Sequence, residues 1–448
     1  MLNKILMLIV LNLTYFFRTL RYRYVSDDIA QVNKKKSKNR LLTLWWQFKG
    51  ISYSNPQVEH LLVILLHTAN CILIYLVFGA SNISFTAALW FAFLPSNNQV
   101  SIWLSGKGYG TATFLCIVMW WLKAWGFIPF LCTYFYGVSA LLMPLIFIPY
   151  GYWYLSLLIP ILFFINRKNI SRVLNTRLAI ITESQKRISL KKITLSIKTF
   201  GYYLTHCLFP RRLGMYHTFL ASYGLSKDDD ECWLKINDKY FWLGVISIIV
   251  VTSGIISDYS GVRFGLIWFC LGIGLWLNLK MINQPIGERF CYLPNVGLML
   301  ALAHLVNGNT ILITAFSVYY ATRLWLHMGA YKDDFKFTEY NLYDVNYPDQ
   351  FTAWRMKGNS ERNLGRPFKA LESYYAGFLV RPRDLQINFL IAQLLAGIGF
   401  YNEAIEHLDK AEASQYYDIK SGVSTAIPLL KQLILEKKGG NGKVAVHK

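Results

Sequence analysis

The sequence predicts an all-α protein, in which a polytopic membrane helix bundle is followed by an α-solenoid of helical repeats. Of the 448 residues, 54% are hydrophobic and 16% are charged, whereas about 25% are charged in ordinary soluble domains. Several runs reach the roughly 20 apolar residues that a membrane-spanning helix needs. Long apolar runs stop near residue 332, and charged residues return. We therefore expect a membrane domain at 1–330, a helical domain at 331–436 and a disordered tail at 437–448.

The charge and the cysteines fit this class. The formal net charge of +21 does not point to nucleic acid first, because excess Lys and Arg mark the cytoplasmic loops and headgroup sites of membrane proteins. None of the seven cysteines has CxxC spacing, and most lie in or beside apolar runs. We expect buried free thiols and no disulfide framework.

Eleven apolar segments are predicted to span the membrane. They cover about residues 5–20, 58–78, 83–94, 109–124, 127–147, 150–165, 193–208, 240–256, 262–281, 296–306 and 311–326. The boundary between the fifth and sixth is the least defined, because Pro144, Pro149 and Pro160 interrupt that region.

The orientation follows from the loop after the sixth span. Residues 166–198 carry nine Lys and Arg residues and a single acid, Glu183, and basic loops stay in the cytoplasm. Six spans before this loop place the N-terminus in the cytoplasm as well. The first loop, at 21–57, is then outside, and eleven spans put the C-terminal domain outside too. The first loop is itself basic, which opposes this topology and suggests that its charge has a function, such as holding a phosphate.

The C-terminal domain contains an internal repeat of 34 residues. The matching positions are Gly358 with Ala392, Gly365 with Gly399, and Ala370 with Ala404. This is the period and the small-residue pattern of tetratricopeptide repeats. A third, degenerate helix pair or a cap is expected at 416–436.

The first of four polar stretches is Ser26-Asp27-Asp28, directly after the first span. A carboxylate can act as a general base for an attacking hydroxyl, or it can bind a metal or a sugar hydroxyl. The structural alternative is a solvated pair that caps a helix in the loop.

The second stretch runs from Gln99 to Gly108. Its glycines let a ligand approach the backbone closely, Lys107 could meet a phosphate, and Trp103 could stack on a sugar. The alternative is an ordinary turn at the membrane interface.

The third stretch holds Arg211 and Arg212 after Pro210, and the fourth holds Glu288 and Arg289. Arginine forks match phosphate oxygens, although two arginines can also reach headgroups without any further role. Charged residues such as Glu288 and Arg289 at the start of a membrane span are costly unless they form an ion pair or take part in function. A structural ion pair is therefore the alternative to a functional role there.

His60 and His67 lie seven residues apart, on one face of the second span. No other pattern supports a metal cluster, so we interpret both as hydrogen-bonding core histidines.

Taken in this order, the four stretches resemble the multi-span O-mannosyltransferases with C-terminal tetratricopeptide repeats, within the GT-C superfamily of glycosyltransferases that use lipid-phosphate sugars. The resemblance covers most of the chain and is most specific at the Asp pair and at Glu288-Arg289-Phe290-Cys291-Tyr292-Leu293-Pro294. The chain differs from the family pattern at Leu94, where the family usually has His, and near Tyr109, where it usually has an acid.

The resemblance implies an inverting transfer from a polyprenyl-phosphate sugar to a hydroxyl of a protein, on the extracytoplasmic side. Asp27 or Asp28 would be the base, and Glu288, His60, Tyr292 and Trp103 would support the site. The residues that would stabilise the departing lipid phosphate are Arg211, Arg212, Arg289 and Lys107. No metal ligands are assigned, and a divalent cofactor, Mg²⁺ or Mn²⁺, stays an open alternative.

Three other functions remain open at this point. The chain could be a transferase of lipid-linked oligosaccharides, or one that modifies a glycan or a lipid. It could also be a non-catalytic membrane scaffold that docks partners through its repeats. A transporter is the third, although the sequence shows no inverted repeat and no series of charges within the spans.

Overall fold

The computed structural model of the chain describes residues 1–26, 28, 51, 55–127, 140–161, 190–214, 239–277, 286–344, 351–413 and 423–444. Within these ranges every regular element is a helix, and no residue is in a β-strand. The predicted all-α class is therefore confirmed for this part of the chain. The described residues form two compact units, one that ends at Phe337 and one that begins at Thr338.

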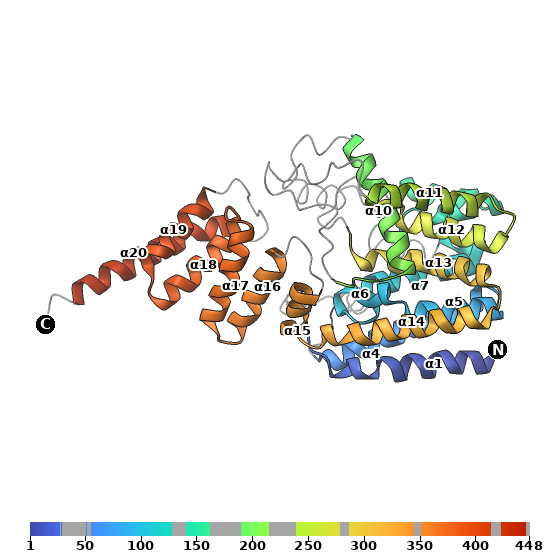
Figure 1. Cartoon of the computed structure of the whole chain (residues 1–448), viewed down its shortest axis with the longest axis horizontal. Helices are drawn as coiled ribbons and strands as arrows, with labels where there is room; N and C mark the ends of the chain where they lie inside the picture. Colours follow the sequence, from blue (N-terminus) through green and yellow to red (C-terminus); the bar gives the residue numbers. More distant parts are fainter. Residues whose placement is uncertain are drawn as a thin grey trace. The chain divides into compact units, whose positions relative to one another are not determined.

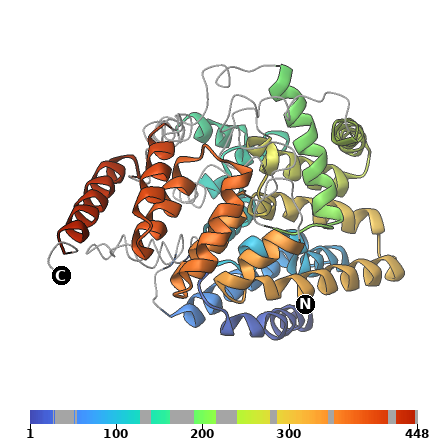
Figure 2. The ribbon, with the colours of Figure 1, turned by 60° about the vertical axis from the view of Figure 1, so that its left-hand side comes forward.

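The long helices of the first unit are α1 (Leu2–Phe16), α4 (Pro56–Val77), α5 (Asn82–Phe93), α7 (Lys107–Leu122), α10 (Leu190–Leu208), α11 (Lys239–Ile256), α12 (Ser260–Ile273), α13 (Tyr292–Val306) and α14 (Thr310–Met328). The short helices between and after them include η1 (Phe17–Arg21), η2 (Pro95–Asn97), α6 (Asn98–Ser101), η3 (Leu104–Gly106), η4 (Lys123–Trp125), η11 (Gly274–Trp276), η12 (Glu288–Cys291), η13 (Gly329–Tyr331) and α15 (Asp334–Glu339). Helices α1, α4, α5 and α14 lie side by side (Figures 1 and 2), and α13 packs against α5, α7 and α12.

Local sequence signals set where these helices begin. Asn55 caps α4 by accepting a hydrogen bond from the backbone N–H of Gln57, and Pro56 occupies the first helical position, where its missing N–H costs nothing. Ser81 and Ser84 form a reciprocal capping box at the start of α5. These caps fix where the helices that carry the polar stretches begin.

Paired glycines let two pairs of helices approach closely. Gly265 of α12 faces Gly297 of α13, and a Cβ built on Gly265 would lie 2.4 Å from the carbonyl oxygen of Gly297. Gly201 of α10 and Gly244 of α11 meet in the same way, with a Cβ on Gly201 only 2.5 Å from the Gly244 Cα. Small residues at such crossings are typical of helices that pack within membranes.

Within the described ranges, four helical segments are long and apolar enough to cross a membrane. They are Leu2–Arg21, Pro56–Val77, Lys239–Ile256 and Glu288–Val306. The last is the central segment, with 78% of its most apolar window buried, whereas only 17% of the Lys239–Ile256 window is buried. Asn82–Phe93 and Ser260–Trp276 are apolar but shorter, so the count of eleven spans stays a prediction.

The first unit combines apolar outer faces with polar groups inside. Large side chains such as Leu6, Ile249 and Ile311 are exposed, while Asn12 and Asn70 are fully buried. Extended apolar surface of this kind needs a partner, such as lipid.

The prediction for the fifth and sixth spans is wrong in the part of that region that the structure describes. Residues 143–157 form two short 3-10 helices, η7 (Met143–Tyr150) and η8 (Trp153–Leu157), in place of long α-helices. Pro144 and Pro149 lie in η7, and a proline inside an α-helix removes a hydrogen bond and clashes with the preceding turn.

In its described residues, the second unit contains the π-helix η14 (Tyr340–Asp344) and five longer helices. These are α16 (Phe351–Asn363), α17 (Pro367–Val380), α18 (Leu385–Ile398), α19 (Tyr401–Glu412) and α20 (Val423–Val444). Helix α16 packs on α17 and α18 packs on α19. The start of each helix in the second pair follows its counterpart in the first pair by 34 residues, which is the period read from the sequence.

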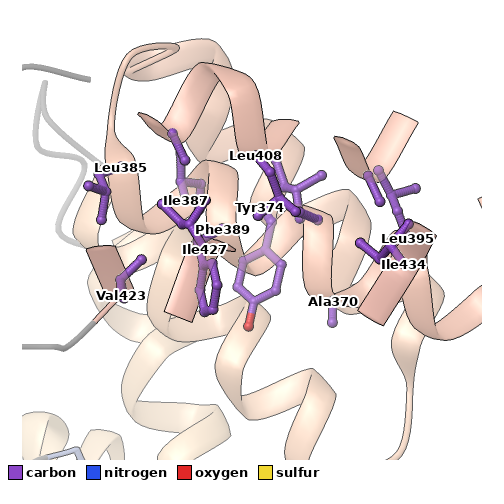
Figure 3. Close-up of a cluster of buried hydrophobic side chains, with 14 of the residues drawn as sticks. Ala370, Tyr374, Leu385, Ile387, Phe389, Leu395, Leu408, Val423, Ile427 and Ile434 are labelled. Carbon is purple, nitrogen blue, oxygen red and sulfur yellow. The ribbon is translucent and has the colours of Figure 1, made fainter. Parts of the chain in front are cut away.

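Equivalent positions of the two pairs share one hydrophobic core (Figure 3). Tyr374 and Leu408, which are 34 residues apart, are both fully buried in it, as are Ala370 and Ala404. Helix α20 adds Ile427 to the same core. The prediction of a disordered tail from residue 437 is wrong up to Val444, because α20 continues through these residues. Lys438 there donates a 2.7 Å hydrogen bond to Asn402.

Candidate functional site

Polar side chains gather where seven helix ends of the first unit meet. The C-terminal ends of α1, α5, α10 and α14 lie there with the N-terminal ends of α4, α7 and α13. We call these residues the polar cluster: Asp28, Glu59, Asn98, Gln99, Trp103, Ser105, Lys107, His206, Glu288, Arg289 and Tyr331. Apart from the Glu59–Lys107 pair, the contacts described below connect its members in one network, which joins the four polar stretches of the sequence.

Asp28 holds the segment before α7. Its Oδ1 accepts hydrogen bonds from the Ser105 N–H at 2.9 Å and from the Ser105 hydroxyl at 2.5 Å, and its Oδ2 accepts one from the Val25 N–H at 3.2 Å. The side chain is almost fully buried. A carboxylate with several hydrogen bonds is a weaker base than a free one. Asp28 is therefore not part of a solvated pair, because its described contacts hold the backbone of Ser105 and Val25; its catalytic role stays a prediction.

Asp27, the other half of the predicted base pair, lies outside the described residues.

Lys107 forms a buried ion pair with Glu59. Its Nζ is 2.7 Å from Glu59 Oε2, and the two side chains are 2% and 0% exposed. Glu59 was not among the predicted site residues. The pairing does not fit the prediction that Lys107 binds the donor phosphate directly, because its charge is already neutralised and enclosed.

The pKa of Tyr24 depends on the negative charge near this pair. Burial, with a smaller contribution from the carboxylates of Glu59 and Asp28, raises the pKa of Tyr24 to about 12. Two carboxylates and one lysine thus lie close together in a largely enclosed region of the polar cluster.

Glu288 is a second fully buried carboxylate of the cluster. Its Oε1 accepts a 2.9 Å hydrogen bond from the Gly214 N–H and lies 3.3 Å from His206 Nε2. Its Oε2 accepts a hydrogen bond from Asn98, whose own oxygen accepts one from the Tyr331 hydroxyl. A buried carboxylate needs hydrogen bonds or an opposite charge to compensate for the loss of water. The partners of Glu288 supply these, and through them Glu288 connects the start of α13 with the ends of α10 and α14.

Arg289 follows Glu288 in the chain and contacts Gln99, Trp103 and Phe290. Its backbone N–H and Nη1 both donate to Gln99 Oε1, at 3.3 and 3.4 Å. Its guanidinium lies 5.8 Å from the ring centre of Trp103 and 4.8 Å from that of Phe290. Trp103 in turn donates a 3.4 Å hydrogen bond to the Val25 carbonyl. The side chain of Arg289 is partly exposed, so it can meet an anion from solution.

Arg211 and Arg212 lie on the surface next to the cluster. Both are exposed, and Arg323 of α14 holds their segment by donating a 2.6 Å hydrogen bond to the Arg211 carbonyl. Gln99 donates a 3.0 Å hydrogen bond to the carbonyl of Gly214, at the end of the same segment. The backbone of this arginine segment is thereby attached at both ends, while its side chains stay accessible.

The remaining predicted residues lie deeper in the bundle. His60 is buried, with its ring edge-on to Tyr22, and no described residue hydrogen-bonds to its Nε2. Tyr292 is also buried and hydrogen-bonds to His67 at 2.6 Å and to Asn70 at 3.3 Å.

The His67 bonds define its tautomer. Its Nε2 lies 3.0 Å from the Ala92 carbonyl, which can only accept, so Nε2 carries the proton and Nδ1 accepts from the Tyr292 hydroxyl. Tyr292 therefore stabilises the interior, and His67 is a hydrogen-bonding core histidine as the sequence analysis interpreted it.

No group of three or more His, Cys, Asp or Glu residues in the described ranges is arranged to hold a metal ion.

Sequence reasoning missed Glu59, Asn98, Ser105 and His206. A signal existed for Glu59, because an acid in the first turn of a predicted span is as costly as the Glu288 that was noticed. Asn98 and Ser105 lie within or beside the second polar stretch, but nothing in their spacing indicates which acid each would bind.

No protein-family model, no curated protein and no solved structure matches the chain.

Proposed function

We propose that the chain is a membrane glycosyltransferase of the inverting type. It transfers a sugar from a polyprenyl-phosphate carrier to a hydroxyl group of a protein acceptor. The observation that carries this proposal is the polar cluster, in which four separate polar stretches are linked by contacts at one end of an apolar helix bundle. A donor with a polar head and a long apolar tail fits such a boundary.

Apart from the fifth and sixth spans, the directions of the helices agree with the alternation of the proposed spans. With a cytoplasmic N-terminus, this topology puts the ends of α1, α5, α10 and α14 and the starts of α4, α7 and α13 all on the outer side. These are the seven ends that meet at the polar cluster. Lys4, at the opposite end of α1, contacts Tyr75 near the end of α4 and Phe85 near the start of α5. The start of α1, the end of α4 and the start of α5 thus lie together, as expected for successive helices that cross the membrane in alternating directions.

In this proposal the two aspartates have different roles. Asp28 positions the loop through Ser105 and Val25, and Asp27 takes the proton of the acceptor hydroxyl. Arg289 with Arg211 and Arg212 stabilises the leaving lipid phosphate as its charge develops. Lys107 supports this arrangement through its ion pair with Glu59.

The second unit is proposed to be a tetratricopeptide-like solenoid that engages the acceptor on the extracytoplasmic side. The 34-residue spacing of the helix starts and the shared core of equivalent small residues support this.

A transfer assay tests the proposed function. Membranes that contain the protein receive radiolabelled polyprenyl-phosphate mannose or polyprenyl-phosphate glucose together with a host extract. Label on protein is the expected result and identifies the sugar. Label on lipid or on free glycan would move the reaction to another transferase class, and no label with any donor would contradict the proposal.

A non-catalytic scaffold is the second candidate, and one observation favours it. Each carboxylate described in the polar cluster, namely Asp28, Glu59 and Glu288, already has a partner within the bundle. A protein that only needs a stable membrane anchor for its repeats would retain the same contacts.

A further inference from the structure

The first helix of each pair in the second unit carries a matching set of polar side chains. Arg355 and Arg362 lie seven residues apart on α16, and Gln386 and Gln393 lie seven apart on α18. Residues with this spacing share one face of a helix. We call these four residues the Arg–Gln ladder.

Two hydrogen bonds join the ladder across the helices. Arg355 Nη1 donates to Gln386 Oε1, and Arg362 Nη1 donates to Gln393 Oε1 at 3.4 Å. Each bond uses one N–H of the guanidinium and the oxygen of the amide, and the amide NH₂ takes no part in it. Arg362 and Gln393 are exposed, and Arg355 and Gln386 are partly exposed. Each step of the ladder therefore offers positive charge and amide donors to a ligand.

The first helix pair is strongly basic. Residues 351–384 contain seven Lys or Arg and three Asp or Glu, whereas 385–413 contain one Lys and four Asp or Glu. Two of the three acids in the basic pair are occupied: Glu361 is buried beside Arg366, and Asp384 caps α18. Arg381 adds a further charge next to Arg355, since both guanidinium groups lie over the Phe351 ring.

The spacing of the ladder matches an extended polypeptide. Seven residues of an α-helix rise about 10.5 Å, and three residues of an extended polyproline II chain, which complete one turn and return to the same face, advance about 9 Å. A peptide that runs along α16 would thus present every third residue to a step of the ladder. Side-chain amides complement peptide groups, and guanidinium forks complement carboxylates.

We propose that the Arg–Gln ladder binds an extended acidic segment of a partner polypeptide. Charge complementarity selects the acidic side chains, and the glutamine amides hydrogen-bond to the peptide backbone. The proposal goes beyond the transfer reaction, because this surface would bind such a segment in a transferase and in a scaffold alike.

A binding measurement on the purified full-length protein tests the proposal. The probe is a fluorescein-labelled peptide with Glu at every third position, separated by Ala and Pro, and its affinity is measured by fluorescence anisotropy. We expect the Arg355→Gln/Arg362→Gln protein to bind about tenfold more weakly or worse, since charge-assisted hydrogen bonds are lost. The matched control is Lys369→Gln/Lys437→Gln, which removes the same charge from exposed positions outside the ladder and should bind normally.

A second variant keeps both arginines. Gln386→Glu/Gln393→Glu places a carboxylate beside each guanidinium, which stabilises the helix contacts but occupies the arginines and repels an acidic peptide. It should fold at least as well as the wild type and lose affinity.

Three results would overturn the proposal. Equal loss of binding in the ladder variant and its lysine control would mean that only net charge attracts the peptide. Unchanged binding in both ladder variants would exclude the surface. Loss of binding to phosphatidylserine vesicles, with peptide affinity intact, would show that the ladder faces a lipid surface instead.

Discussion

The Lys107–Glu59 pair is the most enclosed ion pair that the structure describes, with Nζ and Oε2 2.7 Å apart. Removing one member leaves the other buried without a counter-charge, which costs about 3–5 kcal/mol. We therefore expect Lys107→Met to unfold readily in detergent, measured as a lower midpoint of thermal unfolding.

The double variant Glu59→Gln/Lys107→Met is the control for this prediction. It removes both charges together and should recover much of the lost stability. Equal destabilisation of the single and double variants would mean that the charge pair is not what stabilises this region.

Asp28 should contribute to stability through its hydrogen bonds. Asp28→Asn replaces an acceptor with an amide that cannot satisfy the N–H groups of both Ser105 and Val25. We expect a loss of about 1–3 kcal/mol in the free energy of unfolding. Ser105→Ala, which removes only the hydroxyl donor, should cost less in the same denaturation experiment. A larger loss from Ser105→Ala would show that the carboxylate is not the centre of this contact.

His407 should make the stability of the second unit depend on pH. Its Nδ1 is 2.8 Å from Asn388 Oδ1 and its Nε2 is 3.3 Å from the Tyr375 hydroxyl. Burial and the nearby charge of Lys410 lower the pKa of His407 below its usual 6.5, and Glu406 opposes this only in part. The unfolded chain therefore binds the proton more readily, and stability should fall as the pH drops below about 6.5.

Hydrogen exchange of α18 and α19 at pH 7.5 and pH 5.5 measures this effect. His407→Gln keeps the hydrogen-bonding capacity without a titratable group, and it should reduce the difference between the two pH values. An unchanged pH dependence in this variant would assign the effect to another group.

At the scale of single elements, α12 and α13 depend on a contact between glycines. A Cβ on Gly265 would lie 2.4 Å from the Gly297 carbonyl oxygen and 2.7 Å from the Ala301 nitrogen. Gly265→Ala should therefore force the helices apart, at a cost of about 1–3 kcal/mol. Gly329→Ala is the control, because nothing lies within 4 Å of the added carbon there. Similar thermal midpoints for both variants would contradict the close packing.

The sequence predicted the helices where apolar runs were long and ended at caps or glycines. The second predicted span, at 58–78, differs from α4 by only two residues at its start and one at its end. The helix begins at Pro56 because Asn55 caps it. In the described part of the fifth and sixth spans the prediction failed, because the prolines noted in the sequence, Pro144 and Pro149, shorten the helices there and do more than blur a boundary. The tail prediction failed because composition cannot show that α20 continues from a packed core.

At the scale of the whole chain, composition could not reveal which polar groups meet. Asp28 and Ser105 are 77 residues apart, and Asn98 and Glu288 are 190 apart. The order of the spans places these stretches at one end of the bundle, but only tertiary packing decides that Lys107 pairs with Glu59. The anionic partner of a buried lysine is therefore the part of the site that sequence reasoning could least predict.

The measurement that tests the central claim most directly compares two aspartate variants in the membrane transfer assay. Asp27→Asn should abolish transfer of label to protein while the protein stays folded, as judged by its thermal unfolding. Asp28→Asn should reduce transfer only to the extent that it lowers stability. If Asp27→Asn transferred label as well as the wild type, the chain would not use this aspartate as a base, and the proposed mechanism would be wrong.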